Sequence, residues 1–168
     1  MSDALANRLA LANSMPETAF VARYGALFEH SPWVVEAAAR ARPFADLWQG
    51  LMAPVLAAGR EGQLALICAH PELAGKAAID RTLTQASAAE QASAGLDRLS
   101  EEEYARFHAL NAAYRARHAM PFIICVRRTD KAGILAAMER RTANPTEAEI
   151  ATAIEEIGHI VRLRLEEV

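Results

Sequence analysis

Apolar residues recur at intervals of three and four along most of the chain, which is the spacing of amphipathic helices. Prolines, glycines and small polar residues divide this pattern into separate segments. We therefore expect helices over residues 16–28, 31–40, 44–58, 61–69, 100–117 and 130–141, one that begins at 87, and a last one from 144 to the C-terminus.

Serines are expected to cap three of these helices. Ser87 is followed three residues later by Glu90, and Ser100 by Glu103, which is the capping-box pattern. In a capping box the serine and the glutamate satisfy each other's backbone N–H groups, so this pattern by itself accounts for Glu90. Ser31 precedes a proline, which is tolerated at the first helical position, and it is placed to cap the third helix start.

The run Phe122–Val126 has the composition of a β-strand, yet no second run in the chain is an obvious partner for it. We interpret it as a buried extended segment between helices. The fold class expected is therefore all-α, a multi-helix bundle. A length of 168 residues is sufficient for one good core, which favours a single domain over residues 1–168.

Charge and hydropathy argue against several classes of partner. The net charge is -3, and lysines and arginines are interspersed with acids, so no basic face is expected to bind nucleic acid. No apolar run approaches the length of a membrane span. Met1–Ala12 carries Asp3 and Arg8 and lacks the apolar core of a secretory signal. We therefore expect a cytoplasmic protein that contacts neither nucleic acid nor membrane.

The cysteines and most histidines show no spacing typical of a metal site. Cys68 and Cys125 each lie in an apolar run and are expected to be buried, reduced thiols. His30, His108 and His118 have no acid or cysteine at ligand spacing and are expected to be surface or packing residues. No metal site is predicted.

His70 is the first candidate for chemistry. Because a residue that precedes proline does not easily continue a helix, His70 is expected at the C-terminal edge of the helix over 61–69. Side chains at such ends often point into clefts. A single histidine is more often structural than catalytic, so these residues alone leave both interpretations open.

Arg164 is the second candidate. Ile150, Ile154, Ile157 and Val161 define an apolar stripe on the last helix, and the next position on that stripe is Arg164. A guanidinium that faces the core must be paired or must reach solvent along its stem. The periodicity leaves two partners open, an internal carboxylate or a bound anion.

A series of short motifs, which follow one another from about residue 20 to residue 165, resembles the 2-oxo-4-hydroxy-4-carboxy-5-ureidoimidazoline (OHCU) decarboxylases. The motifs are Phe28-Glu29-His30-Ser31-Pro32-Trp33, Arg42-Pro43-Phe44, His70-Pro71-Glu72-Leu73-Ala74, Ser87 with Glu90-Gln91 and Gly95-Leu96, Leu110-Asn111 with Tyr114, Pro121-Phe122-Ile123, and Leu163-Arg164-Leu165. Enzymes of this family complete the route from urate to allantoin. One departure is visible, since the family usually has an aromatic residue and a glycine before the Pro-Phe-Ile segment, where this chain has Arg117-His118-Ala119-Met120.

The resemblance implies a cofactor-independent carboxy-lyase that forms a homodimer, binds no metal and converts OHCU to (S)-allantoin. It implies His70 as the general acid and a catalytic role for Glu90. Glu90 and Gln91 would bind the polar ring or the ureido group, and Arg164 would hold an anionic group. The substrate-contacting positions that it implies are Pro71, Ser87, Ala88, Ala89, Glu90, Gln91, Phe122, Ile123, Ile124, Cys125 and Val126, the last five through their backbone, and Arg164.

Three other functions are distinguishable from this one. A decarboxylase of a related ureido or imidazolone acid would keep His70 and Glu90 but change the surrounding pocket, and the departure at 117–120 is its support. A non-catalytic helical interaction module would expose an apolar patch. A metal-dependent hydrolase would require a cluster of ligands, which the sequence does not show.

Overall fold

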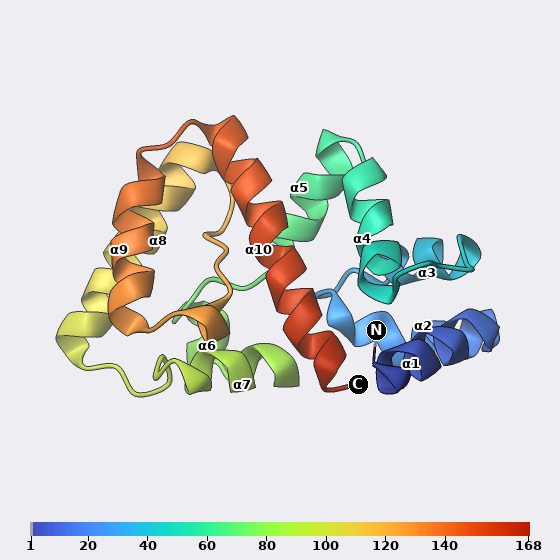
Figure 1. Ribbon diagram of the computed structural model, residues 1–168. Helices are drawn as coiled ribbons and strands as arrows, with labels where there is room; N and C mark the ends of the chain where they lie inside the picture. Colours follow the sequence, from blue (N-terminus) through green and yellow to red (C-terminus); the bar gives the residue numbers. More distant parts are fainter. Residues whose placement is uncertain (1) are drawn as a thin grey trace. The chain divides into compact units, whose positions relative to one another are not determined.

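The computed structural model describes residues 2–168, and within that range it contains helices and loops but no strand (Figure 1). The all-α fold expected from the sequence is confirmed. The elements are α1 (Asp3–Ser14), α2 (Glu17–Tyr24), η1 (Gly25–Leu27), α3 (Pro32–Arg40), α4 (Leu47–Ala57), α5 (Arg60–Cys68), α6 (Lys76–Ile79), α7 (Gln85–Ser93), α8 (Glu101–His118), η2 (Val126–Arg128), α9 (Lys131–Thr142) and α10 (Thr146–Glu166).

These helices group into two compact units, the first of residues 2–66 with 160–168 and the second of residues 67–159. The boundaries fall within α5 and α10. The single domain expected over residues 1–168 remains a prediction.

In the first unit, α3 packs against both α2 and α4. The core between these helices contains Phe20, Tyr24, Val34 and Leu51, all fully buried. Burying each large apolar side chain contributes about 1.5–3 kcal/mol, so these contacts hold the unit together.

Helix α1 was not expected, because its apolar positions do not form a clear stripe. Polar side chains attach it instead. The Asn13 side chain donates to the Phe44 carbonyl (2.9 Å) and accepts from the Phe44 N–H (2.8 Å). The Arg42 guanidinium donates to the Ala12 and Met15 carbonyls at the end of the helix, both at 2.7 Å.

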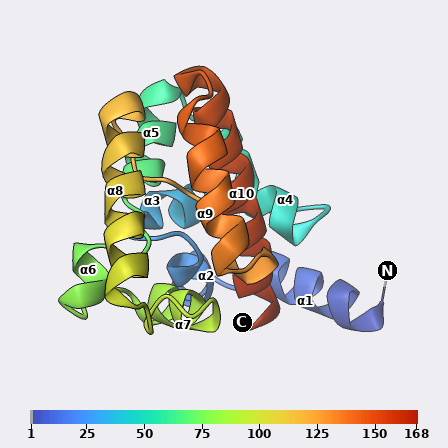
Figure 2. The same ribbon diagram turned by 90° about the vertical axis from the view of Figure 1, so that its left-hand side faces the viewer.

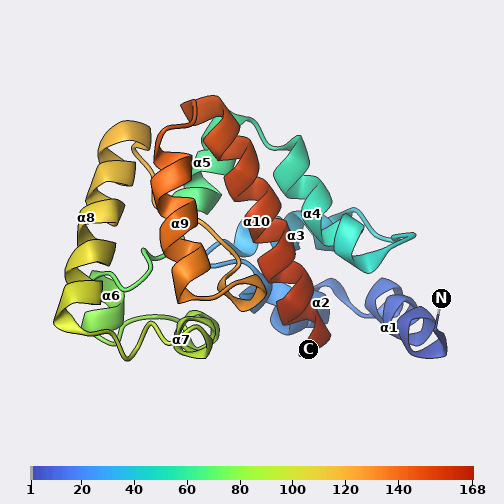
Figure 3. The ribbon, with the colours of Figure 1, turned by 60° about the vertical axis from the view of Figure 1, so that its left-hand side comes forward.

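In the second unit, α8 packs against α9 (Figure 2) and α7 packs against η2. Fully or almost fully buried side chains fill this core: Phe107, Tyr114, Met120, Phe122, Ile134 and Met138. The segment between α8 and η2 is extended and mostly buried, as the sequence predicts for Phe122–Val126. The chain from α5 to α7 is drawn in green in Figure 3.

Two of the predicted helix starts are confirmed in atomic detail. The Ser100 hydroxyl accepts from the Glu103 N–H and the Glu103 carboxylate accepts from the Ser100 N–H, both at 3.1 Å, which completes the capping box of α8. The Asp130 carboxylate accepts from the Gly133 N–H (2.7 Å) at the start of α9. Each side-chain cap contributes about 1 kcal/mol to helix stability.

Two other predicted caps are wrong. Helix α7 begins at Gln85 because the Thr84 hydroxyl accepts from the Ser87 N–H (3.2 Å), so Ser87 and Glu90 lie inside the helix and form no capping box. Ser31 occupies the cap position of α3, but its hydroxyl donates to the Glu29 carbonyl (2.7 Å) and makes no cap hydrogen bond.

Across residues 2–168, no single helix is long and apolar enough to cross a membrane. The successive helices α4 and α5 reach that length and hydropathy only when taken together, and they meet at a bend of 115°.

Candidate active site

His70 lies immediately after α5, in the second unit. Its backbone N–H donates to the Ile67 carbonyl (3.1 Å) and closes the last turn of the helix, and its side chain is buried. The helix-end position expected from the His-Pro pair is therefore confirmed, because the proline prevents the helix from continuing.

The residues after Pro71 form a tight turn before α6. Ala74 has a φ of 51°, in the left-handed region that alanine rarely adopts. A Cβ at Gly75 would lie 2.8 Å from the Glu72 Cβ, so only glycine fits at that position. A turn of this kind needs support from the surrounding structure.

Side chains of α7 and α8 supply that support. The Ala74 N–H donates to Gln91 Oε1 (3.0 Å), and Gln91 Nε2 donates to the Glu72 carbonyl (3.4 Å). Asn111 Nδ2 donates to the Leu73 carbonyl (2.8 Å). Gln91 is buried. The loop that carries His70 is fixed by two helices.

The predicted residues of α7 divide by exposure. Ser87 and Gln91 lie four residues apart and are both buried, whereas Ala88 and Ala89 are exposed. Glu90 is half-buried. Helical periodicity explains the division, because positions i and i+4 share one face.

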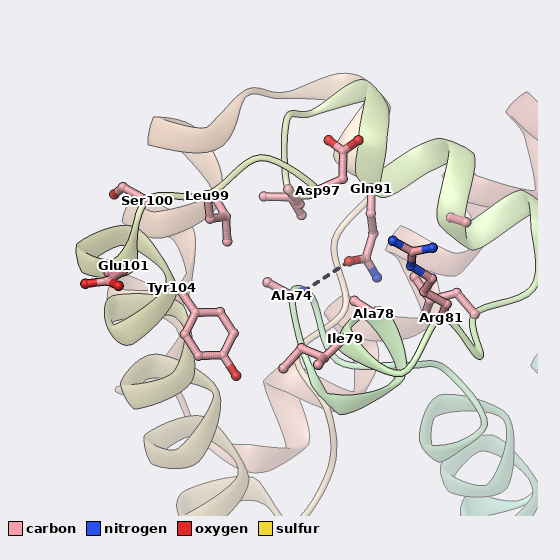
Figure 4. A pocket seen from close by; sticks show the side chains of 13 residues that line it. Ala74, Ala78, Ile79, Arg81, Gln91, Asp97, Leu99, Ser100, Glu101 and Tyr104 are labelled. Atoms are coloured by element: carbon pink, nitrogen blue, oxygen red, sulfur yellow. Dashed lines mark hydrogen bonds between the residues drawn. The ribbon is translucent and has the colours of Figure 1, made fainter.

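A cavity of about 830 Å³ adjoins the turn after Pro71 (Figure 4). Its lining residues come from that turn, from α6 and α7, from the loops that follow them and from the start of α8: Ala74, Ala78, Ile79, Arg81, Leu83, Ala88, Gln91, Leu96, Asp97, Leu99, Ser100, Glu101 and Tyr104. Ala88 and Gln91 are predicted site residues, whereas His70 does not line this cavity.

Polar side chains of α9 and α10 hold the backbone of the extended segment. The Ile123 carbonyl accepts from Arg141 Nη1 (2.8 Å), and the Cys125 N–H donates to Glu156 Oε2 (2.8 Å). Burial raises the pKa of the Cys125 thiol, and the carboxylates of Glu156 and Glu90 raise it further. Helix α7, which contains Glu90, packs against η2, whose N-cap residue is Cys125, so the structure brings together the elements that carry these two predicted residues.

Glu149 is the centre of a network that the sequence analysis did not find. Its carboxylate is fully buried and accepts from the Tyr114 hydroxyl (2.6 Å), from Arg141 Nε (2.9 Å) and from Asn144 Nδ2 (3.0 Å). Burial raises the pKa of Tyr114, and the hydrogen bond to Glu149 adds to the effect. Because Arg141 also holds Ile123, this network fixes the extended segment.

Arg164 belongs to the first unit, where it is buried, as the stripe on α10 predicts. Its Nη2 donates to Glu29 Oε1 (2.8 Å) and its Nη1 to the Leu27 carbonyl (3.4 Å). The internal carboxylate that the sequence left open is thus present.

No group of three or more His, Cys, Asp or Glu side chains within residues 2–168 is arranged to hold a metal ion.

The chain was compared with known proteins. A family model described as OHCU decarboxylase matches residues 13–166. A 2-oxo-4-hydroxy-4-carboxy-5-ureidoimidazoline decarboxylase of Haloferax volcanii is 43% identical over 159 residues, which cover 92% of this chain and 92% of that protein. This chain belongs to the OHCU decarboxylase family.

Solved structures agree with this OHCU decarboxylase assignment. The crystal structure of (S)-allantoin synthase superposes with a TM-score of 0.72 at 28% identity, over 95% of this chain and 53% of that one, so the chain spans about half of its length. An OHCU decarboxylase crystallised in the presence of (S)-allantoin superposes with a TM-score of 0.64 at 20% identity, over 82% of this chain and 91% of that one. The second likeness is one of fold.

The departure of this OHCU decarboxylase family member at 117–120 has a structural counterpart. Ala119 ends α8 with a φ of 55°, in the left-handed conformation that glycine usually supplies at a helix end. Met120, which follows it, is fully buried. The alanine therefore keeps the helix end in place at some cost in backbone strain.

The two cysteines differ, contrary to the sequence-based expectation. Cys125 is buried, but Cys68 is exposed because it is the last residue of α5, beyond the buried Leu66 and Ile67. We expect iodoacetamide to modify Cys68 in the native protein at pH 8 and Cys125 only after unfolding, since burial and a raised pKa both suppress thiolate reactivity. Peptide mass spectrometry over time checks this. Equal rates at the two sites would contradict the placement of Cys125.

Proposed function

We propose that this chain decarboxylates OHCU to (S)-allantoin, with His70 as the general acid. The observation that carries the proposal is the placement of His70. It is buried at the end of α5, on a loop whose backbone is held by Gln91 and Asn111. Membership of the OHCU decarboxylase family supports the choice of reaction.

The decarboxylation does not require the protein to provide an electron sink, because the substrate contains one. The bond between the substrate carboxylate and its carbon breaks, CO₂ leaves, and the electron pair delocalises as an enolate over the neighbouring carbonyl. A proton from His70 then forms the new C–H bond on one face, which sets the configuration of the product. The protein supplies orientation, hydrogen-bond donors and that proton.

Histidine fits the role of proton donor because imidazole changes protonation state near neutral pH. Glu90 lies in the interior of α7, so a helix cap does not account for it. We assign Glu90 and Gln91 to the polar ring or ureido group, together with Pro71, Ser87, Ala88, Ala89 and the backbone of Phe122–Val126. Arg164 is assigned to an anionic group of the substrate.

Freshly generated OHCU tests the proposal. Addition of the protein should accelerate the loss of OHCU and give allantoin whose circular dichroism has the sign of the (S) enantiomer. A rate and an optical activity equal to those without protein would refute the proposal. Turnover of another ureido or imidazolone acid in place of OHCU would support a sister decarboxylase, which the departure at 117–120 favours.

We also propose, from the family resemblance, that the protein forms a homodimer, and, from its composition, that it is cytoplasmic. The free cysteines are compatible with a reducing compartment. Sedimentation equilibrium tests the dimer, since a mass near 18.2 kDa at micromolar concentration would contradict it.

The role of Arg164 leads to a prediction with a matched control. Arg164→Lys keeps a cation beside Glu29 but loses the planar fork that binds a carboxylate through two nitrogens. We expect it to raise KM for OHCU by about tenfold while lowering stability by only about 1 kcal/mol.

Steady-state kinetics with freshly generated OHCU, beside thermal unfolding, measures both effects. Arg162→Lys is the control, because Arg162 is exposed and lies over the Trp48 ring at 4.0 Å. An unchanged KM in Arg164→Lys would remove Arg164 from the site and leave it as the structural partner of Glu29.

A further inference from the structure

One peptide group in the His70 loop is bound on both sides by buried side-chain amides. The carbonyl of the Leu73–Ala74 peptide accepts from Asn111 Nδ2 (2.8 Å), and its N–H donates to Gln91 Oε1 (3.0 Å). The two amides come from different helices, α8 and α7. Figure 4 shows the bond from Ala74 to Gln91.

Little freedom remains between this peptide and His70. Proline at position 71 fixes one backbone dihedral angle. The backbone carbonyl of Glu72 accepts from Gln91 Nε2 (3.4 Å), and the side-chain carboxylate of Glu72 accepts from Arg115 Nε (2.8 Å). On the other side, the His70 N–H is bound to the Ile67 carbonyl. His70 thus lies between a helix end and the bound peptide, and the position of its ring depends on both.

Packing alone does not explain an asparagine at position 111, because this residue lowers stability. The residue is buried, and its Oδ1 has no hydrogen-bond partner among residues 2–168. An unsatisfied buried oxygen lowers stability, and leucine would fill a similar volume without it. The hydrogen bond from Nδ2 to the Leu73 carbonyl offsets this cost.

We infer that Asn111 is a positioning residue for His70, acting through the Leu73–Ala74 peptide. This inference rests on the proposed decarboxylase function, in which His70 delivers the proton. A small displacement of a general acid is enough to slow proton transfer strongly, since misplacement by about 1 Å can cost about 100-fold in rate.

Asn111→Leu tests the inference. We expect kcat for OHCU to fall by about 10- to 100-fold and KM to change by less than about threefold, because the substrate contacts remain. The midpoint of thermal unfolding should change little, because removal of the unpartnered Oδ1 offsets the loss of the hydrogen bond to the Leu73 carbonyl. Amide hydrogen exchange at Ala74 should accelerate by about tenfold or more as the turn loosens.

Asn13→Leu is the matched control. Asn13 is also an asparagine that binds backbone, donating to and accepting from Phe44, but it belongs to the first unit, whereas the His70 loop belongs to the second. We expect it to lower the unfolding midpoint and leave kcat within about twofold of the wild type. Asn111→Ser, whose side chain is too short to reach Leu73, replaces the leucine variant if that one does not fold.

The outcomes separate the two proposals. If wild-type protein turns over OHCU and the Asn111 variant has an unchanged kcat, the positioning role is wrong, whatever the change in stability. If wild-type protein has no decarboxylase activity, the proposed function fails instead. In that case hydrogen exchange at the Ala74 amide still tests whether Asn111 holds the loop. An exchange rate in the Asn111 variant equal to that of the wild type would show that it does not.

Discussion

His70→Ala is expected to lower kcat for OHCU decarboxylation by about 10²–10⁴-fold, which is the usual contribution of general acid catalysis. The allantoin that still forms should lose its optical activity, because solvent then delivers the proton to either face. KM should change much less than kcat, since the variant removes a proton donor and keeps the binding contacts. Stopped assays with circular dichroism of the product measure both quantities.

His108→Ala is the control for this experiment. His108 is an exposed residue of α8 whose ring stacks on Tyr104, with 6.3 Å between ring centroids. Its replacement should leave rate and stereochemistry unchanged. If His70→Ala produced the (S) enantiomer at nearly the wild-type rate, the general acid would have to be another group.

Glu149→Ala is expected to lower the free energy of unfolding by about 3–5 kcal/mol, because it leaves the Arg141 guanidinium buried without its charge partner. The Tyr114 hydroxyl and the Asn144 amide lose their acceptor in the same step. For a chain of this size the midpoint of thermal unfolding should fall by roughly 6–20 °C.

Far-ultraviolet circular dichroism during heating measures this change, and Glu139→Ala is its control. Glu139 also pairs with an arginine, Arg106, but both side chains are about half exposed, so the loss should be about 0–1 kcal/mol. Equal losses in the two variants would show that burial of the Glu149 network does not determine its contribution.

Short-range signals made much of the fold predictable. The capping box of Ser100 and Glu103 and the cap at Asp130 depend on residues three positions apart, so the sequence displays them directly. The same rule failed at α7 because Thr84 and Ser87 are both good caps, and only the structure shows which one the helix uses. Helix α1 escaped notice because Arg42 and Asn13, rather than an apolar stripe, attach it.

The candidate site was predictable for similar reasons and only in part. Pro71 predicts that His70 lies at a helix end, and helical periodicity predicts that Arg164 faces the core; the structure confirms both positions. The support for the loop could not be read in this way. Gln91 and Asn111 bind residues 17 and 38 positions away, and Tyr114 lies 35 positions from Glu149. Contacts between residues this far apart in the sequence depend on the tertiary structure, so no local sequence pattern predicts them.

The division into two units decides what optical signals report. Both tryptophans of the chain, Trp33 and Trp48, belong to the first unit. Intrinsic tryptophan emission during denaturation therefore follows the first unit alone, whereas circular dichroism averages over the helices of both. Superimposable curves from the two probes would mean that the units melt as one cooperative structure, and separate curves would give each unit its own stability.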